Sequence, residues 1–469
     1  MRMSIQAVAD AVGCSIDVED DVKRREVTGI TWDSRKVKEG DIFLAMPGER
    51  VDGNDFISKA IGAGAGMVIC TRQPGESIKA LAGEFVCPLV VVEDGIAAIS
   101  ALASAWRDQL RCVVIGVTGS TGKTSTKDML LSVMGQRYNT VATAGNNNNE
   151  LGVPYTVLRA QKDTEVLIVE MGMRGLGQIS ASCAIAKPNM GIVTNVGVCH
   201  LELLGSRENI ARAKGELFQA LPANGLCVIN GDDDMSAFLR QECAAGRPVK
   251  LFGRGEGLSP RATDVQVNAQ GCAGFNVHMG EEEPVAVSLG MPGEHNVMNA
   301  LAVIAAARHL GVPIASVVEG LAQATGSAMR MDITTTPAGV TVVNDAYNAN
   351  PDSMKAALQT LRGMQCAGKR IAVLGDMGEL GPDEAALHAQ VGMVAAASRL
   401  DVLVCVGPLS RNTAQAAEQA GMPTGCISCV DDAAAAVKLL GTMLQEGDLV
   451  LVKASRFMGL EKIVEEIAK

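Results

Sequence analysis

The sequence of 469 residues contains no apolar run of the roughly 18–20 residues that a membrane-spanning helix requires. Asp10 and the acidic stretch Glu19–Asp21 interrupt any apolar core of a signal peptide near the N-terminus. Basic residues are not in excess, since the net charge is −11. Sequence-independent binding of nucleic acid requires clustered Lys and Arg. We therefore expect a cytoplasmic protein that spans no membrane and binds no nucleic acid.

Patterns typical of zinc sites and disulfide frameworks are also lacking. The five histidines do not have the close spacing of zinc ligands, and the 13 cysteines are spread over predicted strands and helices. One pair, Cys426 and Cys429, has CxxC spacing, but no second pair accompanies it. We interpret the cysteines as small core residues and this spacing as incidental.

The chain is too long for one hydrophobic core. The pattern of predicted strands and helices along it divides into three α/β domains over residues 1–106, 107–326 and 327–469. Apolar strands alternate with amphipathic helices from residue 107, which predicts a doubly wound parallel sheet, and residues 262–289 predict an antiparallel excursion from it. The last domain repeats the alternation and is predicted to be Rossmann-like. The predicted strands are Asp41–Met46, Gly66–Cys70 and Leu89–Glu93, then Cys112–Val117, Glu165–Met171 and Gly191–Val196, then Val340–Val343, Arg370–Leu374, Asp401–Val406 and Leu449–Val452.

A glycine-rich segment, Gly116–Thr124, follows an apolar strand and precedes a predicted helix over Ser125–Met134. Glycines let backbone N–H groups surround phosphate oxygens, and a helix N-terminus favours an anion. Val117 stands where the general motif has its first glycine, and the alternative is a turn without ligand. The placement favours an ATP site, in which Lys123 reaches the terminal phosphates and the Thr124 hydroxyl binds Mg²⁺. The phosphate-binding residues are predicted to be Thr118, Gly119, Ser120, Thr121, Gly122, Lys123, Thr124 and Ser125.

Two further candidates for Mg²⁺ ligands follow later strands. Glu170 ends one apolar strand and His200 follows another. Ligands bind beyond the carboxyl ends of the strands in an open α/β sheet, so both side chains are expected to face Thr124. A structural histidine is an equally good interpretation of His200 by position alone, whereas an ionisable residue that ends an apolar run needs a partner.

A polar pair opens the apolar helix predicted over Asn296–Leu310. Asn296 and Asn299 are three residues apart, so they share a helix face and could hydrogen-bond a flat heterocycle. The alternative is that Glu294 or Asn296 only caps the helix.

These segments, in this order, resemble the Mur ligases, the ATP-dependent enzymes that build the peptidoglycan stem peptide. The resemblance covers essentially the whole chain and rests on Gly116–Thr124, Thr143–Asn146, Glu170–Gly172, Thr194–Gly197 with His200, Glu294–Asn299 and Asp345–Pro351. A second set resembles the members that add a dipeptide: Asn146–Pro154, Tyr347–Met354, Gly375–Gly381 and Lys453–Arg456.

The resemblance implies a ligase that uses ATP and Mg²⁺ to join a UDP-N-acetylmuramoyl-tripeptide to D-alanyl-D-alanine through an acyl phosphate. It implies catalytic roles for Lys123, Glu170, His200 and Lys214, the last as a carbamoylated lysine that supports a second Mg²⁺. By sequence alone, Lys214 would be an ordinary lysine on a helix surface. A monomer is expected.

The resemblance also implies the remaining binding residues. Around ATP it places Asn230, His295, Asn296, Asn299, Arg330 and Asp345. For the two substrates it implies Ser34, Arg35, Asn146, Asn148, Tyr347, Asn348, Asn350, Lys453, Ser455 and Arg456. Met329 stands before Arg330 where relatives usually have glycine, so a different hinge geometry is expected.

Three alternatives differ in testable ways. The sibling ligase that adds the third stem residue usually carries an Asp-Asn-Pro-Arg-like segment, which does not occur here. Folylpolyglutamate synthases share the ATP core, but the Asp33-Ser34-Arg35 domain is not expected in them. A non-catalytic ATP switch would need neither His200 nor Lys214 and no site for an amine.

Overall fold

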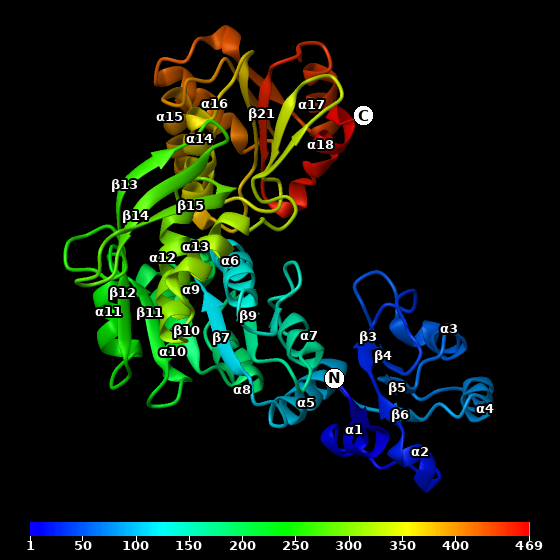
Figure 1. Cartoon of the computed structure of the whole chain (residues 1–469). Helices are drawn as coiled ribbons and strands as arrows, with labels where there is room; N and C mark the ends of the chain where they lie inside the picture. The colour runs from blue at the N-terminus through cyan, green and yellow to red at the C-terminus, as the bar shows by residue number, and fades with distance from the viewer. Residues whose placement is uncertain (469) are drawn as a thin grey trace.

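The computed structural model describes residues 1–468 and contains three parts, each with its own parallel sheet (Figure 1). The N-terminal part lies at one end, the C-terminal part at the other, and the central part, coloured cyan to green, lies between them. This arrangement confirms the predicted fold class, a three-domain α/β protein. No helix within residues 1–468 is long and apolar enough to cross a membrane.

The N-terminal part is a small α/β unit whose parallel sheet has the order β3-β4-β5-β6. Every residue of β4 and of β5 is buried, as expected for strands covered on both faces. A short antiparallel pair, β1 with β2, lies apart from this sheet. The elements are β1 (Met3–Ser4), α1 (Ile5–Ala11), α2 (Asp20–Arg24), β2 (Glu26–Val27), β3 (Gly29–Thr31), β4 (Asp41–Ala45), η1 (Gly53–Phe56), α3 (Ile57–Gly62), β5 (Met67–Cys70), α4 (Glu76–Glu84) and β6 (Leu89–Val91).

The central part is a doubly wound sheet of six parallel strands in the order β12-β11-β10-β7-β9-β8. The chain leaves β7 toward β8 and β9 on one side and returns to β10 on the other, and ligands bind at such a reversal. The residues that follow β7, β9 and β10 therefore meet at one edge. The elements are α5 (Gly95–Arg107), which packs on α7 and α8, then β7 (Val113–Thr118), α6 (Lys123–Gly135), β8 (Thr140–Ala142), α7 (Gly152–Arg159), β9 (Val166–Glu170), α8 (Gln178–Ala186), β10 (Met190–Val193), α9 (Leu201–Leu204), α10 (Arg207–Gln219), β11 (Leu226–Asn230), α11 (Ser236–Phe238), η2 (Leu239–Cys243) and β12 (Val249–Phe252).

The predicted antiparallel excursion is confirmed as a three-stranded sheet of β13 (Arg261–Val267), β14 (Cys272–His278) and β15 (Val285–Pro292). The chain then forms α12 (Asn296–His309) and α13 (Ile314–Gln323), which both pack against α6. Helix α6 follows the phosphate loop directly, so these two helices hold the loop's helix in place from behind.

The C-terminal part has a second six-stranded sheet, in the order β16-β17-β21-β18-β19-β20. Of the six strands described in this sheet, five are parallel and β16 runs antiparallel to its neighbour β17. Neighbouring residues such as Val342 and Val343 enter different core clusters, so helices cover both faces. The elements are β16 (Asp332–Thr335), β17 (Thr341–Asn344), α14 (Pro351–Gly363), β18 (Arg370–Gly375), η3 (Gly381–Asp383), α15 (Glu384–Ala396), β19 (Val402–Val406), α16 (Ser410–Gln419), η4 (Thr424–Cys426), β20 (Ile427–Val430), α17 (Ala433–Leu440), β21 (Leu449–Lys453), η5 (Arg456–Met458) and α18 (Glu461–Ile467).

The hinge between the central and C-terminal parts is anchored at one end and strained at the other. The Ser327 N–H and hydroxyl both donate to Asp128 Oδ2 of α6, at 2.9 and 2.8 Å, and buried Lys127 forms an ion pair with Asp128. Met329 and Met331 then adopt left-handed backbone, with φ of 60° and 51°. A side chain with a Cβ is unfavourable in this conformation.

We expect Met329→Gly to be more stable than Met329→Ala by about 1 kcal/mol, because glycine adopts positive φ without the cost that a Cβ brings. Both variants remove the thioether, so the difference between them isolates the backbone. The measurement is the free energy of unfolding in urea. Equal stabilities would show that residue 329 carries no backbone strain.

Candidate active site

The phosphate loop connects β7 to α6 and needs glycine at two positions. Gly119 and Gly122 have φ of 152° and 78°, and a Cβ on Gly119 would lie 1.9 Å from the Thr194 hydroxyl oxygen. Helix α6 begins at Lys123, two residues earlier than predicted, because Gly122 supplies the left-handed residue before it. The N–H groups of the first helical turn have no carbonyl partner within their own helix and are suited to phosphate oxygens.

Residues after β10 hold this loop in shape. Asn195 accepts from the Ser120 and Thr121 N–H groups, with its backbone and side-chain oxygens, at 3.0 Å each. The Thr194 hydroxyl donates to the Thr121 carbonyl oxygen at 2.6 Å. Thr194–Gly197 belong to a motif of the sequence, but their spacing predicts no role in holding the loop. Their signal was their position at the carboxyl end of a strand beside β7.

A buried carboxylate lies next to the loop. Glu170 is fully buried, and its Oε1 accepts from the Thr124 hydroxyl at 3.2 Å and from Asn148 Nδ2 at 2.7 Å. Its Oε2 is buried and has no hydrogen-bond partner within residues 1–468. An ionised oxygen without a partner is costly to bury. Thr124 and Glu170 therefore fit a hard divalent cation such as Mg²⁺, which takes oxygen ligands.

His200 lies between the central and C-terminal parts. It has left-handed backbone, with φ of 63°, and its Nδ1 lies 2.8 Å from Glu379 Oε2 in the loop after β18. Glu379 also lies 3.6 Å from Arg174 and itself has φ of 60°. Burial lowers the pKa of His200, and the Glu379 carboxylate opposes this shift. No sequence signal predicts a role for Glu379, because its contact with His200 is tertiary.

Two lysines lie near each other at this site, and burial and the charge of Lys123 lower the pKa of Lys214. Lys123 donates from Nζ to the Gly119 carbonyl oxygen at 2.8 Å. Lys214 is 2% exposed on α10 and makes no hydrogen bond or ion pair within residues 1–468. Burial, with the charge of Lys123, lowers the pKa of Lys214 to about 7. Burial also lowers the pKa of Lys123. Lys214 is thus not the helix-surface lysine that its sequence position alone would suggest.

A crevice of about 300 Å³ joins the loop to the C-terminal part. It brings together many of the residues predicted to bind ATP and the dipeptide. Those that line it are Ser120, Thr121, Gly122, Lys123, Thr124, Ser125, His295, Asn296, Arg330, Asp345, Asn348, Asn350 and Lys453. Segments more than 300 residues apart in sequence thereby form one site.

The residues predicted around adenine contact one another and the loop. Asn299 Nδ2 donates to Asn296 Oδ1 at 2.8 Å, and Asn296 Nδ2 donates to the Pro292 carbonyl oxygen at 2.7 Å. Asn299 lies against Gly122, where a Cβ would come within 2.3 Å of its Oδ1. Asn230 donates to the Thr194 carbonyl oxygen at 3.3 Å. Both asparagines on α12 are buried and support the loop as well as the crevice wall.

On the C-terminal side, charged residues are mutually paired. Lys453 is buried and donates to Asp345 Oδ2 at 2.6 Å and to the Asn348 carbonyl oxygen at 2.9 Å. The Arg330 guanidinium lies 4.3 Å from the centre of the Tyr347 ring, and the Arg456 guanidinium lies 6.0 Å from it.

Two other residues predicted for substrate have structural partners. Asn350 caps α14 through the Ser353 N–H and contacts the Cys199 sulfur at 2.9 Å. The buried Ser455 hydroxyl accepts from the Gly378 N–H at 2.9 Å.

The residues predicted to bind the UDP end of a substrate lie in a less enclosed part of the molecule. Arg35 forms a two-pronged ion pair with Asp33 at 2.8 Å, which lowers the pKa of Asp33 to about 2, and its side chain is 78% exposed. Ser34 lies between them in sequence. Trp32 packs edge-on against Tyr155 of α7, with ring centres 5.2 Å apart, and so fixes this segment to the central part. Asn146 is exposed, whereas Asn148 contacts Glu170.

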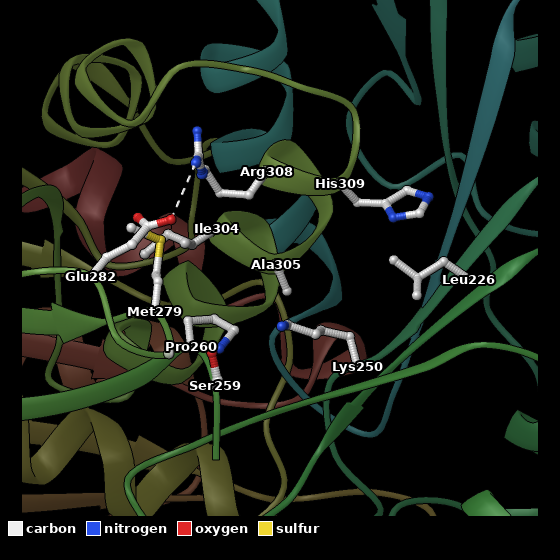
Figure 2. Close-up of a pocket in the computed structure, with 11 residues that line it drawn as sticks. Leu226, Lys250, Ser259, Pro260, Met279, Glu282, Ile304, Ala305, Arg308 and His309 are labelled. Atoms are coloured by element: carbon white, nitrogen blue, oxygen red, sulfur yellow. Dashed lines mark ion pairs between the residues drawn. The ribbon is translucent and has the colours of Figure 1, made fainter. Parts of the chain in front are cut away.

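Figure 2 shows a second cavity, of about 340 Å³, where the amino ends of β11 and β12 meet α12. Ile304, Pro260 and Leu226 form an apolar lining, and Arg308 lies 3.8 Å from Glu282 at the rim. None of the residues predicted to bind substrate or ATP lines it. Although it is slightly larger than the crevice, it lacks the loop and the carboxylate, so chemistry assigns the active site to the crevice.

The chain belongs to the Mur ligase family, which confirms the family expected from the motifs. Three family models match it: the "Mur ligase family, catalytic domain" over residues 26–107, the "Mur ligase middle domain" over 117–307 and the "Mur ligase, glutamate ligase domain" over 329–456.

Among similar proteins, the UDP-N-acetylmuramoyl-tripeptide–D-alanyl-D-alanine ligase of Mycobacterium tuberculosis is 38% identical over 100% of this chain and 98% of its own length. The Bacillus subtilis ligase of the same name is 35% identical over 94% and 93%. The crystal structure of MurF from Acinetobacter baumannii has a TM-score of 0.85 and 32% identity, covering 100% and 99% of the two chains. MurF from Thermotoga maritima, in complex with ADP, has a TM-score of 0.78 and 29% identity, covering 96% and 98%.

Proposed function

We propose that this chain is an ATP-dependent amide ligase that joins D-alanyl-D-alanine to UDP-N-acetylmuramoyl-tripeptide in peptidoglycan precursor synthesis. The observation that carries the proposal is the crevice, in which a phosphate loop next to a buried, partly unpartnered carboxylate faces side chains of a separate domain. Relatives named for this reaction match over nearly the whole chain. The enzyme is proposed to act in the cytoplasm as a monomer.

The proposed reaction has two steps. The tripeptide carboxylate attacks the γ-phosphorus of ATP, the bond to the β-phosphate oxygen breaks, and ADP leaves an acyl phosphate behind. The amine of D-alanyl-D-alanine then attacks the acyl carbon, releasing phosphate and a proton. Phosphoryl transfer depends mainly on positioning and on stabilising charge, which Lys123 and the first-turn N–H groups of α6 supply. The C-terminal part excludes water, which would otherwise hydrolyse the acyl phosphate.

The proposed metal ligands are Thr124, Glu170 and His200. Mg²⁺, when bound, neutralises charge on the transferring phosphoryl group. A carbamoylated Lys214 would support a second ion. Ser34 and Arg35 suit the diphosphate of the UDP end, because a guanidinium and a hydroxyl both donate to phosphate oxygens. Tyr347, Asn348, Asn350, Lys453, Ser455 and Arg456 are proposed to surround the dipeptide.

Phosphate release in the presence of ATP and Mg²⁺ tests this proposal when each substrate is omitted in turn. We expect release to require both the UDP-tripeptide and D-alanyl-D-alanine, because the second step consumes the acyl phosphate. Replacing the dipeptide by meso-diaminopimelate, with a UDP-dipeptide as acceptor, separates the sibling ligase from this one. Phosphate release that continues unchanged without an amine would contradict the proposed ligase activity. ATP binding without any phosphate release would favour a non-catalytic ATP switch.

Carbamoylation of Lys214 is a separate expectation. An uncharged amine is required to attack CO₂, and burial lowers the pKa of Lys214 to about 7, so much of it is neutral at pH 7.5. In ¹³C-bicarbonate, we expect the ¹³C NMR spectrum of the protein to show a carbamate resonance. Lys214→Arg, which stays charged, serves as the control. Identical spectra for the two proteins would exclude the modification.

A further inference from the structure

The edge of the C-terminal sheet carries two cysteines side by side. Strands β19 and β20 are parallel, and their register pairs Cys405 with Cys429. Neighbouring strands lie about 4.8 Å apart, which falls within the roughly 4.4–6.8 Å between Cα atoms that a disulfide allows. Side chains of a paired position point to the same face, and the two thiols lie close enough for each to shift the pKa of the other. The register thus places the two cysteines within the Cα separation that a disulfide spans.

The two thiols differ in exposure. Cys405 is fully buried, whereas Cys429 is exposed on the edge strand. The neighbouring Cys405 thiol, together with the charge of Arg411, lowers the pKa of Cys429 and raises its thiolate fraction. An accessible thiol with a lowered pKa beside a second thiol is the arrangement of a redox-sensitive pair.

The structure also separates this pair from the CxxC spacing in the sequence. Cys426 ends the short 3₁₀ helix before β20 and packs at the margin of the core. Within residues 1–468 its thiol makes no hydrogen bond, while the register places Cys405 opposite Cys429. The register therefore gives Cys429 a neighbour other than Cys426, the residue that the sequence spacing pairs with it.

We propose that Cys405 and Cys429 form a redox-active pair that hydroperoxides convert to a disulfide. The Cys429 thiolate attacks one oxygen of hydrogen peroxide, the O–O bond breaks, and a sulfenic acid and hydroxide form. The proton that Cys429 released on ionising converts the hydroxide to water. The Cys405 sulfur then attacks the Cys429 sulfur as its proton leaves, the S–O bond breaks, and a second water departs. Two thiols are oxidised and one peroxide is reduced to two waters.

The pair lies close to a turn that contacts the loop carrying Glu379. Gly407 packs against the Asp376 carboxylate, and the Ser410 N–H donates to Asp376 Oδ1 at 2.7 Å. Cys405 is two residues from Gly407, and Glu379 is three residues from Asp376. The cysteine pair thus lies at the sheet edge close to the turn that holds Gly407 and Ser410, and this turn contacts the loop that carries Glu379.

The experiment treats the full-length protein with a small molar excess of hydrogen peroxide, alkylates the remaining thiols and maps the peptides without reduction. We expect a cross-linked pair joining the peptides of Cys405 and Cys429, which dithiothreitol releases. Cys426→Ser is the matched control and keeps the cross-link. In the Cys405→Ala variant, we expect peroxide to convert Cys429 to a sulfenic acid that dimedone traps. Circular dichroism checks that this variant is folded.

In Cys429→Ser, we expect Cys405 to remain fully alkylatable after unfolding, because the buried thiol has lost its accessible partner. A cross-link from Cys429 to Cys426 in the native protein would overturn the proposal. So would the recovery of Cys405 and Cys429 as free thiols at peroxide concentrations that oxidise the partly exposed cysteines, such as Cys14 and Cys366.

Discussion

Lys123→Met is expected to lower the rate of dipeptide-dependent phosphate release by about a thousandfold while leaving the fold intact. Lys123 lies in the crevice, and its ammonium group is held by carbonyl oxygens of the phosphate loop, at 2.8 Å from that of Gly119. Removing one preorganised group that stabilises transition-state charge costs roughly 10²–10³ in kcat, and this lysine adds a full charge. Methionine keeps the length of the side chain and removes only the ammonium group.

A second lysine on the same helix provides the contrasting control. Lys127 is buried, forms an ion pair with Asp128 and donates to the Ser327 hydroxyl at 3.4 Å. Lys127→Met removes the ion-pair partner of the nearly buried Asp128 carboxylate, which then keeps only the two Ser327 donors. Breaking a buried ion pair typically costs about 3–5 kcal/mol. We expect this variant to unfold more easily and to keep phosphate release per folded molecule near normal. Lys123→Met should show the reverse, and activity near the wild-type level in Lys123→Met would contradict its role.

Glu379→Ala is expected to lower kcat about tenfold by weakening closure of the C-terminal part over the crevice. Glu379 contacts His200 at 2.8 Å and Arg174 at 3.6 Å, and both partners belong to the central part. About 1.4 kcal/mol of differential stability between closed and open states changes their ratio tenfold. Because the contact lies between domains, the folding of each domain should be unaffected.

Hydrogen exchange distinguishes closure from direct catalysis. We expect Glu379→Ala to speed exchange in the segments around 197–204 and 375–381 in the presence of ATP, and Glu379→Gln to have an intermediate effect. Glu384→Ala is the matched control, because Glu384 is exposed at the start of α15. Unchanged exchange together with a lowered kcat would mean that Glu379 acts on the chemistry and not on closure.

The phosphate loop and its neighbours could be predicted in detail from the sequence. The strand predicted over Cys112–Val117 is observed over Val113–Thr118, and the helix predicted from Ser125 begins at Lys123. Such local features follow from apolar periodicity and from glycine at positions that need positive φ. Their spacing along the chain carries the information, so no distant residue has to be known.

Partners at a distance could not be predicted in this way. Nothing in the residues around Glu379 indicates that its carboxylate lies 2.8 Å from His200, nearly 180 residues earlier. Asn54 is a second example: it is buried, and its amide donates to the Thr71 hydroxyl, 17 residues later, at 3.0 Å. It therefore serves the fold of the N-terminal part.

By itself, the sequence determined the three-domain α/β fold, the phosphate loop with Lys123 and Thr124, and the family, because periodicity and motif order are local properties of the chain. Only the tertiary structure decided that one oxygen of Glu170 is buried without a partner, that Lys214 is buried near Lys123, and that Cys429 pairs with Cys405. Burial and pairing depend on which strands become neighbours, and strand order is set by packing of the whole sheet rather than by any single segment.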